Sequence, residues 1–202
     1  MSTVYFNRIA VTGPRSAVLG FREDARRRGV PLSLDQLFRK RNLVAPSSDG
    51  VPKDISPFHY YAHVLRPTEW HGYTRIDYEL EIKNYEVYEF LIPVSRAYRE
   101  LCFVDSQICL HDGSIIAVYA ARGRSSTWNL SMDRCDSHWV LAAKAHGIGK
   151  LEDAYEDDSI RSDAEDGMLT EALGHWDKRV LRVLRRRNRL QKPARATRQA
   201  AE

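Results

Sequence analysis

Several stretches of the chain alternate between apolar and polar residues, the period of two that is typical of β-strands. In the stretch 74–84, Ile76, Tyr78 and Leu80 fall on one face and charged residues fall on the other. A hairpin is predicted around the Asp-Gly dipeptide that ends at Gly113, because this dipeptide favours tight turns between strands. The predicted strands cover residues 4–11 and 74–84 and a strand pair within 101–122.

Other stretches place apolar residues three and four positions apart, the spacing of one helix face. Ser33 is a suitable N-cap for a short helix, and Pro93 lies inside a helical pattern, so we expect a kink there or a helix that begins there. Residues 122–135 are expected to form a further strand or an ordered loop, and 44–57 an exposed loop. Residues 59–74 fit neither period. The predicted helices cover residues 14–29, 33–40, 84–101, 137–147 and about 166–189.

The order of these elements, strand, helix, strand, helix and strand pair, predicts an α+β fold. The specific expectation is a ferredoxin-like α/β sandwich with an antiparallel sheet, followed by an amphipathic basic helix. We therefore expect a domain at 1–150, an acidic connector at 151–167, the helix at 168–190 and a disordered tail at 191–202. The apolar stripe of this helix, a candidate surface for a protein partner, consists of Leu169, Leu173, Trp176, Val180 and Leu184.

The charge of the chain is concentrated near its C-terminus. The net charge is +4, but the ten cations and single carboxylate of residues 178–202 give +9, which leaves −5 for residues 1–177. Residues 152–166 contain eight carboxylates and one arginine and carry −7. An acidic segment therefore directly precedes a basic one, and any attraction to a polyanion is local.

The overall composition is that of an ordinary globular protein. With 43% hydrophobic residues, the chain can bury a core without disulfide bonds. Its three cysteines, an odd number, argue for a reducing compartment. The N-terminus lacks the apolar segment of a signal peptide, and no stretch is apolar enough to span a membrane. We therefore expect a cytoplasmic protein.

Five short motifs follow one another along the chain: FNRIAVTGP, AVLGF and LSLDQLF, then YELEI and VSRAYRELCFV. In this order they resemble the ferredoxin-like domain of YubB-type proteins, which are largely encoded on plasmids and other mobile elements. The likeness covers residues 4–43 and 76–119. The resemblance implies a ferredoxin-like domain without established catalytic residues. It also suggests an accessory or inhibitor protein of a mobile element, by analogy alone.

Two groups of side chains have the chemistry of metal ligands. His59, His63 and His71 include a pair four residues apart, but Tyr60 stands where a zinc peptidase has its glutamate. The second group has a spacing unlike the usual zinc frameworks. It consists of Cys109, His111, Cys135 and His138. Phosphate-binding loop and dinucleotide-binding motifs do not occur. We therefore predict no metal, no cofactor and no enzymatic activity, with a metal-dependent enzyme as the least favoured alternative.

The basic C-terminal helix is the main candidate for a functional site. Cations that neutralise phosphates of a nucleic acid release counterions, which favours binding at low salt. A second candidate surface combines arginines with hydroxyl side chains and a stacking ring, a composition suited to phosphate and base contacts. The predicted nucleic-acid-binding residues are Arg179, Arg182, Arg185, Arg186, Arg187 and Arg189 in the helix and Arg122, Arg124 and Trp128 in the second surface.

Other interpretations of the basic helix remain open at this point. Cations near a helix C-terminus are favoured by the helix dipole alone, and the acidic segment could fold back onto the basic one. The apolar stripe could also bind a protein partner, a second copy of the chain or a membrane surface. We predict a non-enzymatic protein that binds DNA or RNA, with a protein-interaction module as the alternative.

Overall fold

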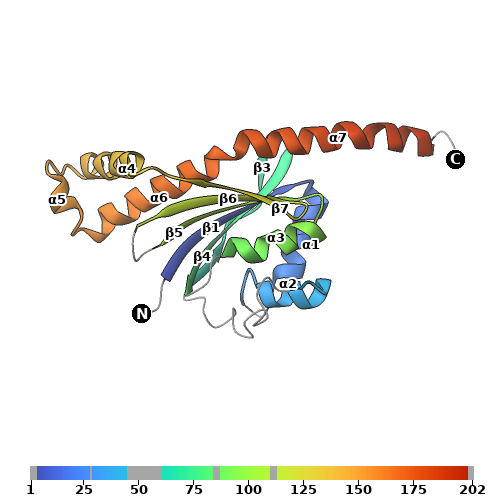
Figure 1. Cartoon of the computed structure of the whole chain (residues 1–202), viewed down its shortest axis with the longest axis horizontal. Coiled ribbons are helices and arrows are strands. Elements are labelled where there is room, and N and C mark those ends of the chain that lie inside the picture. Colours follow the sequence, from blue (N-terminus) through green and yellow to red (C-terminus); the bar gives the residue numbers. More distant parts are fainter. Residues whose placement is uncertain (1–3, 28, 45–60, 84–86, 110–112, 200–202) are drawn as a thin grey trace.

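The protein has an α+β fold, in which an antiparallel seven-stranded sheet carries helices on both faces (Figure 1). The computed structural model describes residues 4–27, 29–44, 61–83, 87–109 and 113–199. The strand order is β2-β4-β1-β5-β6-β7, and β3 pairs with β4. The strands are β1 (Val4–Gly13), β2 (Tyr61–Val64), β3 (Thr68–Trp70), β4 (Tyr73–Lys83), β5 (Cys102–Cys109), β6 (Ile115–Ala121) and β7 (Arg124–Asn129). The helices are α1 (Arg15–Ala25), α2 (Leu34–Arg41), α3 (Val87–Ala97), α4 (Met132–Ala145), α5 (Leu151–Ala154), α6 (Asp158–His175) and α7 (Asp177–Gln199).

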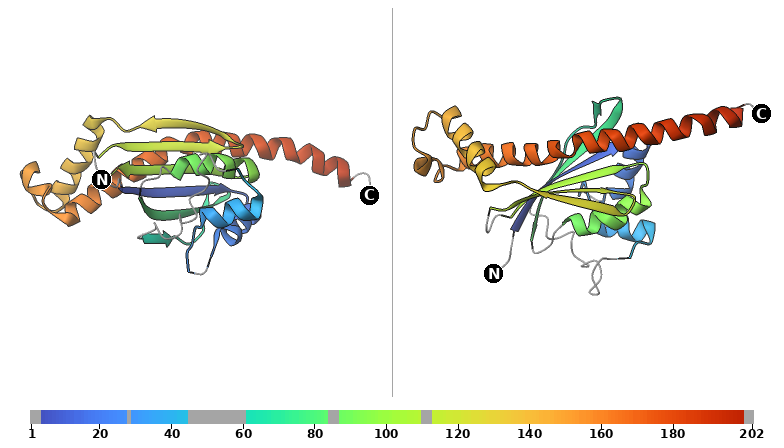
Figure 2. Two further views of the ribbon diagram at one scale, coloured as in Figure 1. Left: turned by 60° about the horizontal axis from the view of Figure 1, so that its bottom comes forward. Right: turned by 45° about the horizontal axis from the view of Figure 1, so that its top comes forward.

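Helices α1, α2 and α3 cover one face of the sheet (Figure 2). Phe21 of α1 lies at the centre of this layer and makes edge-on ring contacts with Tyr78, Tyr98 and Phe103, at centroid distances of 6.2, 5.1 and 5.3 Å. Aromatic pairs prefer this edge-to-face geometry. The alternation of apolar residues in β4 thus fills the space between the sheet and these helices.

Helices α4 and α6 and the first half of α7 belong to the core on the other face. Trp176, between α6 and α7, donates a hydrogen bond from its indole Nε1 to the carbonyl oxygen of Ala117 in β6, at 3.2 Å. His138 of α4 contacts Glu171 of α6, with Nε2 and Oε2 2.8 Å apart. The segments 151–167 and 168–190 therefore share a core with the sheet and do not form separate appendages.

The structure confirms the α+β class and most elements expected from periodicity. The hydroxyl of Ser33 accepts a hydrogen bond from the backbone N–H of Gln36 at 3.3 Å, as expected for a cap. Pro93 lies inside α3 and does not begin it. Residues 122–135 contain β7, and the stretch 59–74, which fits neither period, contributes β2 and β3. Residues 45–57 of the loop predicted at 44–57 and the turn residues at 110–112 lie outside the described residues.

The C-terminal helix differs from the sequence prediction at both ends. The single helix expected over 166–189 is interrupted at Trp176, where α6 ends and α7 begins. The interruption follows Gly174, and glycine weakens a helix because its backbone has more freedom to lose. At the other end, α7 runs to Gln199 and includes most of the segment 191–202 that we expected to be disordered. Glutamine, lysine, alanine and arginine, which favour helices, dominate this segment.

Asp24 links α1 to the helices beside it. Its carboxylate accepts hydrogen bonds from the hydroxyl of Tyr98 at 2.7 Å, from Lys40 at 3.2 Å and from Arg41. Partial burial opposes the charged form, but these donors outweigh it and lower the pKa of Asp24 below its ordinary value. The lowered pKa means that the folded protein favours the ionised carboxylate more than the unfolded chain does.

This contribution to stability is complete above the unfolded-state pKa of about 3.9 and is lost as the pH falls through the lower folded-state pKa. We expect Asp24→Asn to lower the free energy of unfolding by about 1 kcal/mol at pH 6, a magnitude usual for partly exposed ion pairs. Urea unfolding at pH 6 and pH 3 measures the difference, which should shrink at pH 3. Asp153→Asn, at an exposed carboxylate, is the matched control. A difference that is equal at both pH values would contradict this account.

Candidate functional site

Five cations lie on the side of α7 that faces away from the sheet. Val180 and Leu184 hold the opposite side of the helix against the sheet, with exposures of 2% and 1%. Each of these cations has another one three or four residues away in the chain, so they share one helix face. All five are exposed, and we call them the outer face of α7: Lys178, Arg182, Arg185, Arg186 and Arg189.

The outer face has no acidic partner within the part of the chain that the structure describes. The acidic segment lies at the far end of the α6–α7 pair, where α5 and the start of α6 are found (Figure 1). There Asp163 contacts His146 at 2.7 Å, Asp166 pairs with Arg8 at 2.5 Å and Asp157 caps α6. The acidic segment therefore does not neutralise the basic helix within the chain.

Two of the six helix arginines that we predicted as nucleic-acid ligands lie outside the outer face. Arg179 packs its guanidinium over the rings of Tyr119 and Trp176, at 4.8 and 5.3 Å from the ring centroids. Arg187 is buried, with only 8% of its surface exposed. Its position three residues after Leu184 puts it on the apolar face of the helix. Arg187 is therefore not a ligand on the outer surface, which corrects the prediction for this residue.

The second predicted surface divides into two places. Arg122 and Gly123 form the turn between β6 and β7, and exposed Arg124 begins β7 beside them. Trp128 lies near the other end of β7, where its ring stacks on His175 at 4.2 Å with an interplanar angle of 9°. One face of the indole is thus already covered. The structure brings Arg122 close to α7 but does not combine it with Trp128 in one binding surface.

The apolar stripe predicted as a partner surface is part of the protein's own core. The exposed fraction of the residue surface is 0% for Leu169, 5% for Leu173, 7% for Trp176, 2% for Val180 and 1% for Leu184. All five belong to the core on the sheet face that α6 and α7 cover. The stripe is therefore not available to a partner or a membrane surface, because the sheet of the same chain occupies it.

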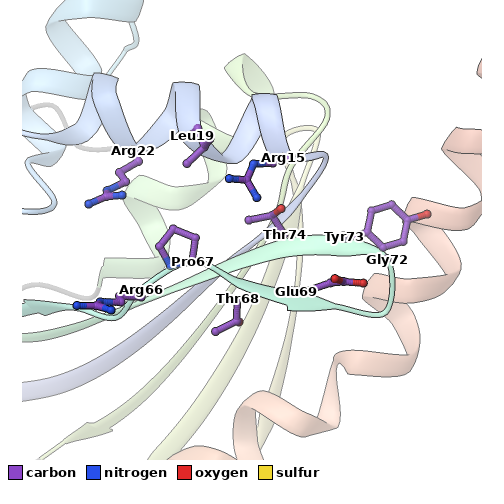
Figure 3. Close-up of a pocket in the computed structure, with 10 residues that line it drawn as sticks. All are labelled: Arg15, Leu19, Arg22, Arg66, Pro67, Thr68, Glu69, Gly72, Tyr73 and Thr74. Carbon is purple, nitrogen blue, oxygen red and sulfur yellow. The ribbon is translucent and has the colours of Figure 1, made fainter.

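A basic groove between α1 and the β3–β4 hairpin was not predicted from the sequence. Its volume is about 660 Å³, and Arg15 and Arg22 line it from α1, opposite Arg66 and Glu69 (Figure 3). Tyr73 at the end of the groove points toward α7 (Figure 3), and its hydroxyl accepts a hydrogen bond from Asn188 at 2.9 Å. The groove and α7 are therefore neighbours. A cluster that joins residues so far apart in the chain leaves no local sequence signal.

The candidate metal ligands are not brought together in the described part of the chain, where no group of three or more His, Cys, Asp or Glu could hold an ion. His59 and His111 lie outside the described residues. His63 pairs with Glu79 in the register of β2 and β4. His71 lies in the turn before β4. The strand between this turn and Glu79 is roughly 20 Å long, so His71 is far from His63.

In the second group, Cys109 and Cys135 are buried. His138 is engaged by Glu171, as described above. Its imidazole therefore joins α4 to α6.

Comparisons with protein-family models, curated proteins and solved structures find no match for this chain. Among the described helices, none has both the length and the apolar character required to cross a membrane.

Proposed function

We propose that the protein binds nucleic acid through the outer face of α7. The observation that carries the proposal is a row of exposed cations that have no acidic partner in the described part of the chain. Such a row neutralises successive phosphates, and counterion release then supplies the binding free energy. Phosphate contacts do not distinguish one base from another, so we propose binding with little sequence preference.

The helix dipole does not account for this row. The dipole favours cations within about one turn of a helix C-terminus, but α7 continues to Gln199. Arg182 and Arg185 lie well before that turn, and Lys178 lies in the first turn, where the dipole disfavours a cation. A role outside the helix itself therefore explains their positions better.

The shape of the molecule also supports contact with a polymer. The last part of α7 extends beyond the sheet (Figures 1 and 2), and the outer face directly precedes it on the side of the helix away from the sheet. A long ligand that lies along this side can therefore follow the helix without meeting the sheet. Tyr73 lines the basic groove and also a second hollow that Arg122 lines beside Leu184 and Asn188 of α7. Arg15 and Arg122 therefore add positive charge beside the middle of α7, and Arg22 and Arg66 continue it along the groove (Figure 3).

We also infer that strands β2, β4, β1 and β5 form a ferredoxin-like unit. Their order in the sheet and their alternation with α1–α2 and α3 are those of the split β-α-β arrangement. In this interpretation β6 and β7 extend the sheet, and α6 and α7 cover the face that the unit leaves open. The resemblance to YubB-type proteins remains a proposal, and the fold carries no function with it.

The test is fluorescence anisotropy of labelled duplex and single-stranded DNA and RNA, titrated with the full chain at several salt concentrations. We expect the triple substitution of Arg182, Arg185 and Arg189 by Gln to weaken binding by about tenfold to a hundredfold near 0.1 M salt. The slope of log K against log salt should fall by roughly 0.9 for each phosphate that the variant no longer neutralises.

The matched control removes the same charge from other exposed positions. It carries Arg26→Gln, Lys144→Gln and Lys150→Gln, which lie away from α7 and are exposed. We expect this control to bind like the unaltered protein. Equal affinity of the two triple variants, or no binding by the unaltered protein at low salt, would rule out the proposal.

A further inference from the structure

A small cavity lies beneath α7, between the helix, the β6–β7 turn and the start of β5. Its volume is about 190 Å³, and Leu184, Arg187 and Asn188 line it from α7. Arg99, Glu100 and Arg122 line it from the other elements, together with Tyr73. Its lining thus includes three guanidinium groups and a single carboxylate.

Arg187 is the buried member of this group, and most of its hydrogen-bonding capacity is unused. Nη1 donates to the carbonyl oxygen of Leu101 at 3.3 Å. Nε and Nη2 are shielded from solvent and have no nitrogen or oxygen acceptor among the described residues, and the guanidinium lies close enough to the thiol of Cys102 to act on its pKa. No carboxylate pairs with Arg187 in the same part of the chain. A buried charge without a partner is strongly unfavourable, so such groups are normally paired or bind a ligand.

The nearby thiol does not supply the missing charge. Burial raises the pKa of Cys102 above its ordinary value, although Arg187 and Arg122 act in the opposite direction. The thiol is therefore neutral near pH 7, and a neutral sulfur is only a weak acceptor. Among the described residues, the positive charge of Arg187 therefore has no ion-pair partner, and Glu100 is the single carboxylate that lines the same cavity.

Two further features prepare the cavity for an anion. Arg122 and Gly123 form a tight turn in which both residues have a left-handed backbone conformation, with φ of 55° and 76°. The first position of such a turn usually holds Asn or Asp, and an arginine there is strained. Tyr73 already accepts a hydrogen bond from Asn188, so its own O–H is left to donate. The lining thus offers hydrogen-bond donors from Tyr73, Arg122 and Arg187.

We propose that this cavity binds a phosphate group, held by Arg187 from within and by Arg122 and Arg99 at its mouth. Arginine offers several donors in a planar fork that suits the oxygens of phosphate. Three guanidinium groups against one carboxylate match the charge of a dianion. The volume equals that of about six water molecules in the liquid, which is enough for a tetrahedral oxyanion and smaller than a usual organic-ligand pocket. The site is distinct from the outer face of α7 and does not depend on the function proposed for it.

The first experiment measures thermal unfolding and titration calorimetry with inorganic phosphate, against chloride at equal ionic strength. We expect phosphate to raise Tm by several degrees, with a shift that grows with the logarithm of its concentration, because a ligand of the native state stabilises it. Arg187→Met and Arg122→Gln should abolish the heat of binding and the specific part of the Tm shift. Arg185→Gln, which removes the same charge from the outer face, should respond like the unaltered protein and corrects for general salt effects.

Arg187→Met serves a second purpose, because an apolar replacement of a buried unpaired charge is often neutral or stabilising. We expect its Tm in phosphate-free buffer to equal or exceed that of the unaltered protein. Arg122→Gln, at an exposed position, keeps the test valid even if Arg187→Met fails to fold. Equal responses to phosphate and chloride in the unaltered protein, or unchanged phosphate binding in Arg122→Gln and Arg187→Met, would overturn the proposal.

The phosphate can come from the medium or from the end of a nucleic acid. A short oligonucleotide with a 5′-phosphate and its 5′-hydroxyl counterpart distinguish these sources in competition with inorganic phosphate. Tighter binding of the phosphorylated form that depends on Arg187, and persists in the triple outer-face variant, assigns a terminal phosphate. Equal binding of both forms, with phosphate binding intact, assigns a free ion. Because inorganic phosphate alone reports on the cavity, failure of polymer binding to the outer face leaves this result unaffected.

Discussion

Removal of residues 178–202 is expected to lower the free energy of unfolding by about 3–6 kcal/mol. The deletion takes away Val180 and Leu184, which are almost fully buried against the sheet. Each such side chain contributes roughly 1.5–3 kcal/mol by burial, and domains of this size are stable by only about 5–15 kcal/mol. Urea unfolding of the full and truncated chains, followed by far-ultraviolet circular dichroism, measures the difference by linear extrapolation.

The triple substitution of Arg182, Arg185 and Arg189 by Gln is the control for this deletion. It removes charge from the same helix without touching its buried side, so its free energy of unfolding should stay within about 0.5 kcal/mol of that of the unaltered protein. A truncated protein with an unchanged unfolding midpoint would mean that α7 is not part of the core. Because the deletion alters the fold as well as the charge, loss of nucleic-acid binding on truncation says little about the arginines.

The second large effect is expected for Trp176→Ala. The indole is 7% exposed, donates a hydrogen bond to Ala117 at 3.2 Å and lies 5.8 Å from the ring of Tyr119. Replacement of a buried tryptophan by alanine costs about 3–5 kcal/mol, because transferred surface and a cavity both contribute. Thermal and urea unfolding should agree on this loss, and Arg179 should lose one of the two rings beneath it.

Trp139→Ala provides the comparison for Trp176→Ala. Trp139 is only half-buried and meets Tyr155 edge-on at 4.7 Å. Its removal should cost clearly less than that of Trp176, about 1–2 kcal/mol, because less apolar surface returns to water. Equal losses in the two variants would contradict the position of Trp176 at the centre of the contact between helix and sheet.

The elements that periodicity predicted are those whose own residues fill a core. The alternation in β4 and the three-four spacing in α1 are both explained by the packing of Phe21 against Tyr78. Strands β2 and β3 were not predicted, because they are short and form by pairing with β4. A strand that a neighbour organises does not need a pattern of its own.

The candidate site was predictable in part. The cations of α7 are visible in the sequence, and the spacing of Val180, Leu184 and Arg187 by four and three residues already places Arg187 on the apolar face. The cavity beneath α7 was not predictable, because Arg122 and Arg99 reach Arg187 only through the pairing of β5, β6 and β7. The local sequence around each arginine does not indicate that the three side chains line one cavity.

The separation of the acidic start of α6 from the outer face of α7 affects the rate at which the protein meets a polyanion. Opposite charges at the two ends of a long body turn it in the field of a polyanion before contact, so that α7 arrives first. This orientation raises the association rate only while the field extends far enough, about 30 Å at 0.01 M salt and 10 Å at 0.1 M. The rate of encounter should therefore fall with salt more steeply than it would for an evenly charged domain of the same net charge.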